Sequence, residues 1–381
     1  SGFRRRASAP KGAPRVFWMY AGFIVLVLAL LALDLGVFHR KAHVVSVKEA
    51  LGWSAFWIAL GLAFSGFIYL GYENHWLGLG LTPDMMTLRP VAVEGLGTVY
   101  NDGASALVKY VTGYLVEKSL AVDNIFVISM IFTFFAVPAL YQHRVLFWGI
   151  LGALILRGMM IAAGARMIQE FSWIIYVFGG FLILTGIKML LLKEGETDPN
   201  KNLVVRATRK LFPVTERFHG EHFFVRAGTD ASHEAETPGA AVVADRVVDA
   251  AKAGTLLATP LLLALVMVEF TDLIFAVDSI PAIFAITADP FLVFTSNVFA
   301  ILGLRSLYFA LAGMIDSFRY LKVALAVVLM VVGVKMMTHT WLKAMLGENF
   351  NLYLLAVVLS ILAAGVVASL WKSRSEERAA R

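Results

Sequence analysis

The chain has 381 residues, of which 59% are hydrophobic and only 16% are charged, so it lacks the polar surface that a soluble protein needs. Its net charge of +6 fits loops and tails beside an anionic lipid surface and gives no reason to expect nucleic acid as a partner. Cysteine is absent, which excludes disulfides and thiolate metal sites. The few histidines fall in predicted loops or at a span end, so a metal held inside the membrane would need oxygen ligands.

Apolar runs that are long enough to cross about 30 Å of hydrocarbon recur along the chain. They predict an all-α polytopic membrane protein with about nine transmembrane helices, at residues 16–38, 50–72, 109–135, 145–168, 171–192, 256–287, 290–314, 320–340 and 351–371. The first run follows a basic segment, as the apolar part of a signal peptide does. It is too long for that role and has no small-residue cleavage site, so we interpret it as a retained span.

The spans divide the chain into segments with different expected roles. These are an N-terminal tail (1–15), two peripheral transmembrane helices (16–72), an external loop (73–108), a first group of three helices (109–192), a cytoplasmic loop (193–255), a second group of three helices (256–340), and a last transmembrane helix with a cytoplasmic tail (341–381). Basic residues in short loops, such as Arg40, Arg144 and Lys372, predict an external N-terminus and a cytoplasmic C-terminus. The basic N-terminal tail is the exception to this pattern.

The two groups of three helices share an internal repeat. Four pairs of peptides match in order: Ala121-Val-Asp-Asn-Ile125 with Ala276-Val-Asp-Ser-Ile280, Leu156-Arg157 with Leu304-Arg305, Met167-Ile-Gln-Glu-Phe171 with Met314-Ile-Asp-Ser-Phe318, and Gly186-Ile-Lys-Met189 with Gly333-Val-Lys-Met336. Each unit has an odd number of spans and the connecting loop starts and ends on one side, so the second unit should cross the membrane in the opposite direction. An inverted 3+3 repeat of this kind places a transport site near the midplane.

Five carboxylates lie in two of the apolar spans. The span 109–135 carries Glu117 and Asp123, and the span 256–287 carries Glu269, Asp272 and Asp278. In the repeat, Glu117 corresponds to Asp272, and Asp123 corresponds to Asp278. Each ionised carboxylate near the bilayer centre costs roughly 2.5–3.5 kcal/mol, so their retention indicates a compensating cation.

The spacing of these carboxylates predicts that both helices are broken. Glu117 and Asp123 are six residues apart, so on a regular helix they would point about 120° away from each other. We therefore expect an unwound stretch around Ala-Val-Asp in each span, as in transporters with discontinuous helices. Pro281 supports a break in the second span because it leaves the carbonyl of Val277 without its helical donor, and that oxygen is a further candidate ligand.

The candidate neutral oxygen ligands are Asn124, Ser279 and Asn297. Carboxylate, amide and carbonyl oxygens without thiol or imidazole favour hard cations such as Mg²⁺, Ca²⁺ or Mn²⁺. Several carboxylates in one place should also raise one another's pKa values, so release of protons on metal entry is a natural form of coupling.

A second interpretation assigns the carboxylates a purely structural role. They would then pair with the basic residues of the spans, namely Lys118, Arg157, Lys188, Arg305 and Lys335. Arg157 and Arg305 hold equivalent positions in the repeat and are expected counter-charges under either interpretation.

The chain resembles the TerC/Alx family of bacterial membrane proteins. Three motifs carry the resemblance: Glu117-Lys-Ser-Leu-Ala-Val-Asp-Asn-Ile-Phe126, Val268-Glu-Phe-Thr-Asp-Leu-Ile-Phe-Ala-Val-Asp-Ser-Ile-Pro-Ala-Ile283, and Ser296-Asn-Val-Phe-Ala-Ile-Leu-Gly-Leu-Arg-Ser-Leu-Tyr308. The resemblance covers roughly residues 20–370 and implies manganese efflux across the bacterial inner membrane. It also implies that the acidic residues are essential, which by motif position are Glu117, Asp123, Glu269, Asp272 and Asp278.

The leading hypothesis is a secondary transporter that exports Mn²⁺ through a carboxylate-lined site at mid-membrane, with Ca²⁺ or Mg²⁺ as alternative ions. One alternative is a membrane stress-response scaffold, and another is an exporter of small organic cations or amino acids. No enzymatic activity is expected, and the Gly-x-Gly-Asp motif of intramembrane aspartyl proteases is absent from the sequence. The partners are the divalent ion and the lipid bilayer, and no motif identifies a protein partner for the loop 193–255.

Overall fold

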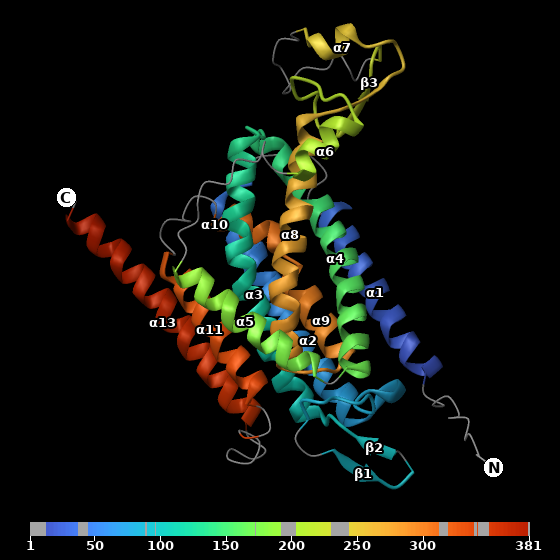
Figure 1. The fold of residues 1–381 in the computed structure, drawn as a ribbon, viewed down its shortest axis with the longest axis vertical. Coiled ribbons are helices and arrows are strands. Elements are labelled where there is room, and N and C mark those ends of the chain that lie inside the picture. The colour runs from blue at the N-terminus through green and yellow to red at the C-terminus, as the bar shows by residue number, and fades with distance from the viewer. Residues whose placement is uncertain are drawn as a thin grey trace.

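Long helices form the body of the protein, and a small unit of strands and short helices lies beyond one end of them (Figure 1). The computed structural model describes residues 13–36, 45–87, 90–95, 97–171, 173–191, 203–229, 244–311, 319–338, 341 and 350–379. The long helices and the α9–α10 pair are α1 (Ala13–Gly36), α2 (Val47–Glu73), α3 (Gly103–Phe134), α4 (Ala139–Glu170), α5 (Ile174–Leu191), α8 (Pro260–Phe284), α9 (Pro290–Ile301), α10 (Leu304–Leu311), α11 (Arg319–Met337) and α13 (Phe350–Ala379). The small elements are η1 (Trp76–Gly78), β1 (Val91–Val93), β2 (Gly97–Val99), α6 (Leu203–Leu211), β3 (Phe224–Arg226), α7 (Arg246–Ala250) and β4 (Leu256–Ala258).

Seven helical segments in the described part of the chain are long and apolar enough to cross a membrane: α1, α2, α4, α5, α8, the α9–α10 pair and α13. The helix α3 is as long as α4, at 32 residues, but carries Lys109, Glu117 and Lys118. The helix α11 adds a shorter apolar stretch, Val323–Met337. The prediction of an all-helical membrane domain is therefore confirmed, and the count of nine spans stays a prediction.

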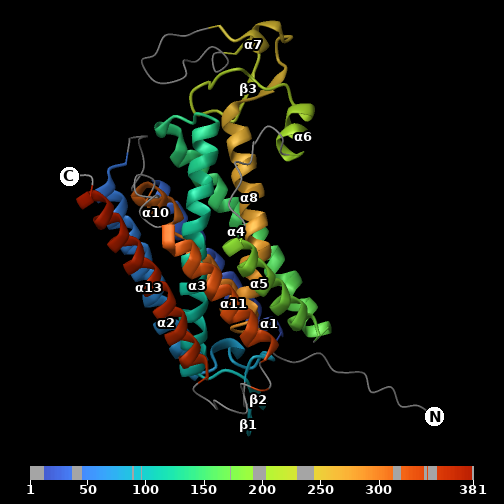
Figure 2. The ribbon, with the colours of Figure 1, turned by 60° about the vertical axis from the view of Figure 1, so that its left-hand side comes forward.

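The helices of the two predicted groups pack against each other rather than forming separate domains. The helix α3 packs on α8 and α9, α4 packs on α8, and α5 packs along α11. On one flank α13 lies beside α11 (Figure 2). Buried apolar side chains form one cluster among α1, α2, α3, α4, α8, α9 and α10, and a second among α3, α4, α5, α8, α9, α11 and α13.

The predicted breaks in the third and sixth spans are wrong, because α3 and α8 run through Ala-Val-Asp as continuous helices. Pro281 lies in the last turn of α8, which ends at Phe284, and a proline there disturbs only the end of the helix. The break occurs in the seventh span, between α9 and α10. There Gly303 has a φ of +80°, and an added Cβ would lie 2.5 Å from Cβ of Trp57, so glycine is required for both reasons.

The two ends of the bundle differ. The antiparallel β1–β2 hairpin lies at one end, which we call the hairpin end, and α7 lies at the opposite end, the α7 end (Figure 1, Figure 2). At the α7 end, β3 pairs with β4 in antiparallel register, with Val225 opposite Leu257. The chain then passes from β4 through Thr259, the N-cap residue of α8, directly into that helix.

Candidate functional site

Arg157 lies midway along α4 and binds carboxylates of two other helices. Its Nη1 donates to Oε1 of Glu117 on α3. Its Nη2 and Nε donate to the two carboxylate oxygens of Asp272 on α8, at 2.7 and 3.1 Å. The side chains of Arg157 and Glu117 are only 3% and 1% exposed. Two of the five predicted carboxylates therefore meet, and the counter-charge between them is an arginine of the chain itself.

Two predicted neutral ligands lie at the same place. Nη1 of Arg157 is 3.3 Å from Oδ1 of Asn297 and 3.5 Å from Oγ of Ser279. Asn297 is fully buried on α9, and Ser279 is buried on α8. The guanidinium group is thus surrounded by oxygen atoms from three helices, which is the donor set expected for a hard cation.

Several polar atoms beside Arg157 are buried without a hydrogen-bond partner in the described part of the chain. They are Oε2 of Glu117, Oε2 of Glu269 and Nδ2 of Asn297. Buried polar atoms are nearly always satisfied in proteins, and leaving one unsatisfied costs about 1–3 kcal/mol. Their concentration here identifies a place where a ligand or water would be stabilised.

Gly152 of α4 makes room for Glu269. A Cβ added at Gly152 would overlap the carboxylate of Glu269, so that no other residue fits while the carboxylate holds this position. The carboxylate of Glu269 is also close enough to Asp272 for electrostatic repulsion. We refer to Arg157, Glu117, Asp272, Glu269 and Asn297 as the Arg157 cluster.

The other predicted site residues whose side chains the structure describes do not contact Arg157. Asp278 accepts a hydrogen bond from Oγ1 of Thr185 on α5, at 3.2 Å. Asn124 is buried on α3, and the side chain of Val277 is half exposed. Asp123 belongs to α3, but its side chain lies outside the described residues.

The remaining basic residues have other partners. Arg305 forms an ion pair with Asp34 of α1, at 2.7 Å. Lys118 donates to the carbonyl oxygens of Ala300 and Leu302, at 3.1 and 3.3 Å, and so caps the end of α9 at the helix break. Lysine at a helix C-terminus offsets the negative end of the helix dipole.

The described residues do not assemble a metal site in this arrangement. Among the described residues, no three acidic or histidine side chains lie close enough together to hold a metal ion. Cation binding at the Arg157 cluster would therefore require the guanidinium group to leave Glu117 and Asp272.

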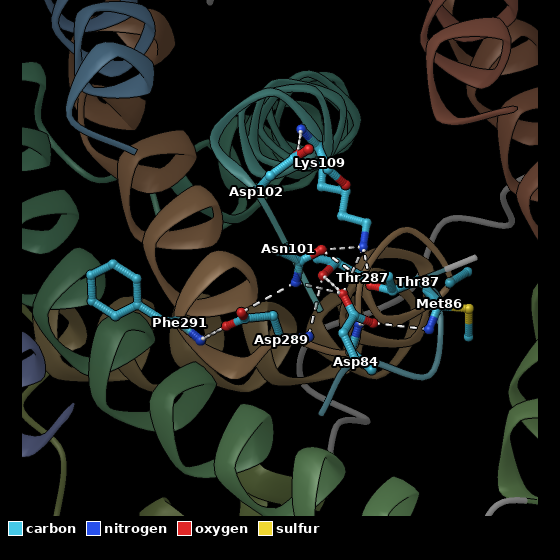
Figure 3. A network of polar contacts seen from close by, with 12 residues as sticks. Asp84, Met86, Thr87, Asn101, Asp102, Lys109, Thr287, Asp289 and Phe291 are labelled. Atoms are coloured by element: carbon cyan, nitrogen blue, oxygen red, sulfur yellow. Dashed lines mark hydrogen bonds and ion pairs between the residues drawn. The ribbon is translucent and has the colours of Figure 1, made fainter. Parts of the chain in front are cut away.

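A second buried polar network lies at the hairpin end and was not predicted from the sequence (Figure 3). Nζ of Lys109 on α3 donates to three oxygens: Oδ2 of Asp84 at 2.9 Å, Oγ1 of Thr87 at 2.9 Å and Oδ1 of Asn101 at 2.5 Å. The side chains of Lys109 and Asp84 have no exposed surface. With Thr287 and Asp289, these residues form what we call the Lys109 network.

Asp84 joins three segments of the chain that are far apart in sequence. Besides Lys109, it accepts hydrogen bonds from Oγ1 of Thr287 at 2.6 Å and from the amides of Ala288 and Met86 at 2.8 and 2.9 Å. Burial alone would raise its pKa. The Lys109 ammonium and the Thr287 hydroxyl outweigh burial and hold the pKa of Asp84 well below its usual range.

Asp289 caps α9 and closes the network. Its Oδ1 accepts from the amide of Phe291 at 3.0 Å, and its Oδ2 lies 3.4 Å from Nδ2 of Asn101. Burial, together with the nearby charge of Asp84, raises the pKa of Asp289 to about 6.

One sequence signal could have pointed to this network. Lys109 is a lysine at the start of an apolar span, and the preceding loop carries Asp84 and Asn101. The pairing of Asp84 with Thr287 joins residues 203 positions apart, which no local pattern predicts.

Comparison with known proteins agrees with the helical membrane architecture. Residues 102–377 match a protein-family profile with the description "Integral membrane protein TerC family". The chain is 47% identical over 356 residues to the uncharacterised membrane protein STKORF319 of Myxococcus xanthus, covering 93% of each chain. It is 41% identical to proteins named Alx and described as proposed membrane-bound redox modulators. The match covers 95% of this chain and 97% of the Salmonella typhi protein, and 90% and 94% for the Escherichia coli K12 protein.

No solved structure matches the chain. The family profile covers well over half of the sequence and includes all five predicted carboxylates, and the relatives extend the similarity over almost the whole length. The protein therefore belongs to the TerC family of integral membrane proteins.

Proposed function

We propose that the protein is a secondary transporter that exports divalent cations, Mn²⁺ in particular, from the bacterial cytoplasm. The observation that carries this proposal is the Arg157 cluster, in which acidic groups of α3 and α8 share one counter-ion beside unpartnered oxygens. Fixed negative charge in an apolar bundle is costly and is retained where a cation must pass. The basic residues of the short loops favour a cytoplasmic α7 end and an external hairpin end.

In this mechanism the guanidinium group of Arg157 occupies the cation site and balances its negative charge while no ion is bound. When the guanidinium group moves away, the oxygens of Glu117, Asp272, Glu269 and Asn297 become available to an entering ion. These are carboxylate and amide oxygens, which suit Mn²⁺, Ca²⁺ and Mg²⁺. After the cation leaves, the return of Arg157 neutralises the carboxylates, so the empty transporter does not carry buried uncompensated charge.

Asp278 is proposed as a neighbouring cation-binding position on the transport pathway. It lies six residues beyond Asp272 on α8, a rise of about 9 Å along the helix. Its hydrogen-bond partner is the hydroxyl of Thr185, and the ammonium of Lys188 on α5 lies within electrostatic range, so an entering cation would compete with a lysine rather than an arginine. Asp123 is the equivalent position in the repeat, and Asn124 follows it.

The packing of α5 and α11 supports the inverted repeat on which alternating access depends. A Cβ added at Gly186 would lie 2.7 Å from the carbonyl oxygen of Ala326, and one added at Gly333 would lie 2.8 Å from that of Gly179. In the repeat, Gly186 corresponds to Gly333, and Gly179 corresponds to Ala326. The two contacts are therefore reciprocal, as expected for units related by a twofold axis.

The contacts among the other repeat helices have the same reciprocity. The helix α3 packs on α9 much as α4 packs on α8, and α3 corresponds to α8 while α4 corresponds to the α9–α10 pair. The carboxylates of the Arg157 cluster come from the two equivalent helices α3 and α8. This supports a transport site at the junction of the two units.

A structural scaffold is the second candidate, and the geometry of Arg157 favours it in one respect. The two-point contact with Asp272 and the contact with Glu117 form a complete ion-pair triad that could simply hold three helices together. The Alx relatives are described as proposed redox modulators. This chain has no cysteine, so thiol exchange is not a route by which it could act on redox state.

Reconstitution in liposomes that contain a manganese-sensitive dye separates the two candidates. We expect Mn²⁺ flux in the wild type and a loss of at least about tenfold in Glu117→Gln and Asp272→Asn. Glu170→Gln is the matched control, because Glu170 is an exposed carboxylate of α4 that pairs with Arg166 away from the Arg157 cluster. Wild-type flux equal to that of empty liposomes would favour the scaffold.

A further inference from the structure

The Lys109 network has the geometry of an occupied cation site. Nζ of Lys109 is held by a carboxylate, a hydroxyl and an amide oxygen at 2.5–2.9 Å, from Asp84, Thr87 and Asn101. The exposed fractions of Lys109, Asp84 and Asn101 are 1%, 2% and 0%. Oxygens of these three types are the usual ligands of Ca²⁺, Mg²⁺ and Mn²⁺ in proteins.

The network contains more negative charge than Lys109 neutralises. Asp289 is a second, fully buried carboxylate, and it is linked to Asp84 through the amide of Asn101. The hydroxyl of Tyr72 is completely buried and close enough to Asp289 to stabilise its carboxylate. Lys109 thus pairs directly with one of two carboxylates, and Lys335, which donates to the carbonyl of Ala285, is a second buried lysine within electrostatic range of Asp84.

The network also lies in line with the Arg157 cluster. Lys109 and Glu117 belong to the same continuous helix, eight residues apart, which is a rise of about 12 Å. The other members come from the segment before α3 and from the connector between α8 and α9. The two sites are therefore separated by about two turns of α3, with the Lys109 network nearer the hairpin end.

We propose that Asp84, Thr87, Asn101 and Asp289 form a second divalent-cation site on the outward route, where the Lys109 ammonium competes with the exported ion and so promotes its release. This role as a release site rests on the proposed export function. The ammonium group of Lys109 is covalently attached to the chain, so it reoccupies the oxygen site as soon as the ion departs. Return of the ion is then opposed by a charge that cannot diffuse away.

Removal of the Lys109 ammonium group tests the site without any transport measurement. In Lys109→Ala the ammonium is lost and the oxygens remain, so Mn²⁺ should bind in its place. We expect millimolar Mn²⁺ to raise the unfolding temperature of the purified variant in detergent by about 5 °C, saturably, with Na⁺ at equal ionic strength giving no such rise. Adding Asp84→Asn to Lys109→Ala should abolish the effect.

Lys118→Ala is the matched control. It also removes a mostly buried ammonium from α3, but the partners left behind are the backbone carbonyls of Ala300 and Leu302, with no carboxylate among them. Its unfolding temperature should not respond to Mn²⁺ beyond the wild-type response. An equal response in Lys118→Ala and Lys109→Ala would overturn the proposal.

Asn101→Asp decides the question if Lys109→Ala does not fold without metal. This substitution keeps the shape of the side chain and adds a second carboxylate next to Lys109, so Mn²⁺ should displace the ammonium and stabilise the variant. No Mn²⁺-dependent rise in either variant would overturn the proposal, and so would failure of both to fold in the presence of Mn²⁺. Stabilisation by Mn²⁺ with no flux in liposomes would retain the cation site and reject export.

Discussion

The Arg157 cluster and the Lys109 network are both buried groups of acidic residues around a basic side chain, but Arg157 contacts two carboxylates whereas Lys109 contacts one, Asp84. They differ in how completely the polar atoms are satisfied. Asp84 has hydrogen-bond donors on both oxygens, including two backbone amides. Beside Arg157, by contrast, oxygens of Glu117 and Glu269 have no partner in the described residues.

This difference indicates how readily each charge can exchange its partner. A carboxylate held by backbone amides keeps its position when its counter-ion changes, because those donors cannot move away. Glu117 and Asp272 of the Arg157 cluster depend on one side chain, that of Arg157. The Lys109 network therefore resembles a fixed coordination shell, whereas the Arg157 cluster can rearrange when its arginine moves.

The largest expected effect is loss of the arginine itself. Arg157→Met leaves Glu117 and Asp272 buried without a counter-ion, so the free energy of unfolding should fall by about 3–5 kcal/mol, measured by denaturant titration in detergent. Neutralising all three residues, as Glu117→Gln, Arg157→Met and Asp272→Asn together, should recover most of this loss. A triple variant as unstable as Arg157→Met alone would contradict the ion-pair explanation.

The pH dependence of the Lys109 network should follow Asp289, whose pKa is about 6 in the folded protein because of burial and the charge of Asp84. A raised pKa stabilises the fold below the unfolded value of 3.8, and this contribution disappears as the pH rises through 6. Relative to Asp289→Asn, the wild type should thus lose up to about 3 kcal/mol between pH 4 and pH 7. A pH-independent difference between the two proteins would show that Asp289 does not titrate in this range.

Gly152→Ala tests whether the space for Glu269 in the Arg157 cluster matters. The added methyl group overlaps the carboxylate, so we expect about 1–3 kcal/mol of destabilisation and a clear loss of Mn²⁺ flux. Gly158→Ala is a matched control on the same helix, since a Cβ there would meet only Phe294 at an ordinary 3.5 Å. Equal effects of the two substitutions would indicate a general cost of packing rather than a requirement for Glu269.

The smallest effect is expected outside both clusters, at Thr185. Thr185→Val keeps the side-chain shape but removes the hydrogen bond to Asp278, which should cost about 0.5–1.5 kcal/mol in thermal or denaturant unfolding. If Asp278 is a cation-binding position on the transport pathway, the apparent affinity for Mn²⁺ should also change. A change in stability with unchanged Mn²⁺ affinity would leave Thr185 a structural role only.

The membrane helices could be predicted because apolar length and hydropathy are local properties of the sequence. The position of the helix break could not. Asp123 and Asp278 suggested unwinding, but a carboxylate that bonds to a neighbouring helix, as Asp278 does to Thr185, needs no break in its own helix. The actual break at Gly303 depends on the approach of Trp57 from α2, a contact that joins distant parts of the chain.

The candidate site was predictable in part, because the internal repeat can be recognised in the sequence alone. The repeat placed Glu117 and Asp272 at equivalent positions, and the structure joins them through Arg157. Which base pairs with which acid depends on helix rotation, so the sequence left Arg157 and Arg305 equally plausible. The metal role of all these residues stays a prediction.

The direct junction between β4 and α8 has a mechanical consequence. The hydroxyl of Thr259 donates a hydrogen bond to the carbonyl oxygen of His222 at 2.7 Å, and α8 starts at the next residue with no linker between them. A binding partner that rotates the β3–β4 sheet would rotate α8 with it, together with the side chains of Glu269 and Asp272. A rotation at the α7 end can in this way be transmitted along α8 itself to the carboxylates inside the bilayer.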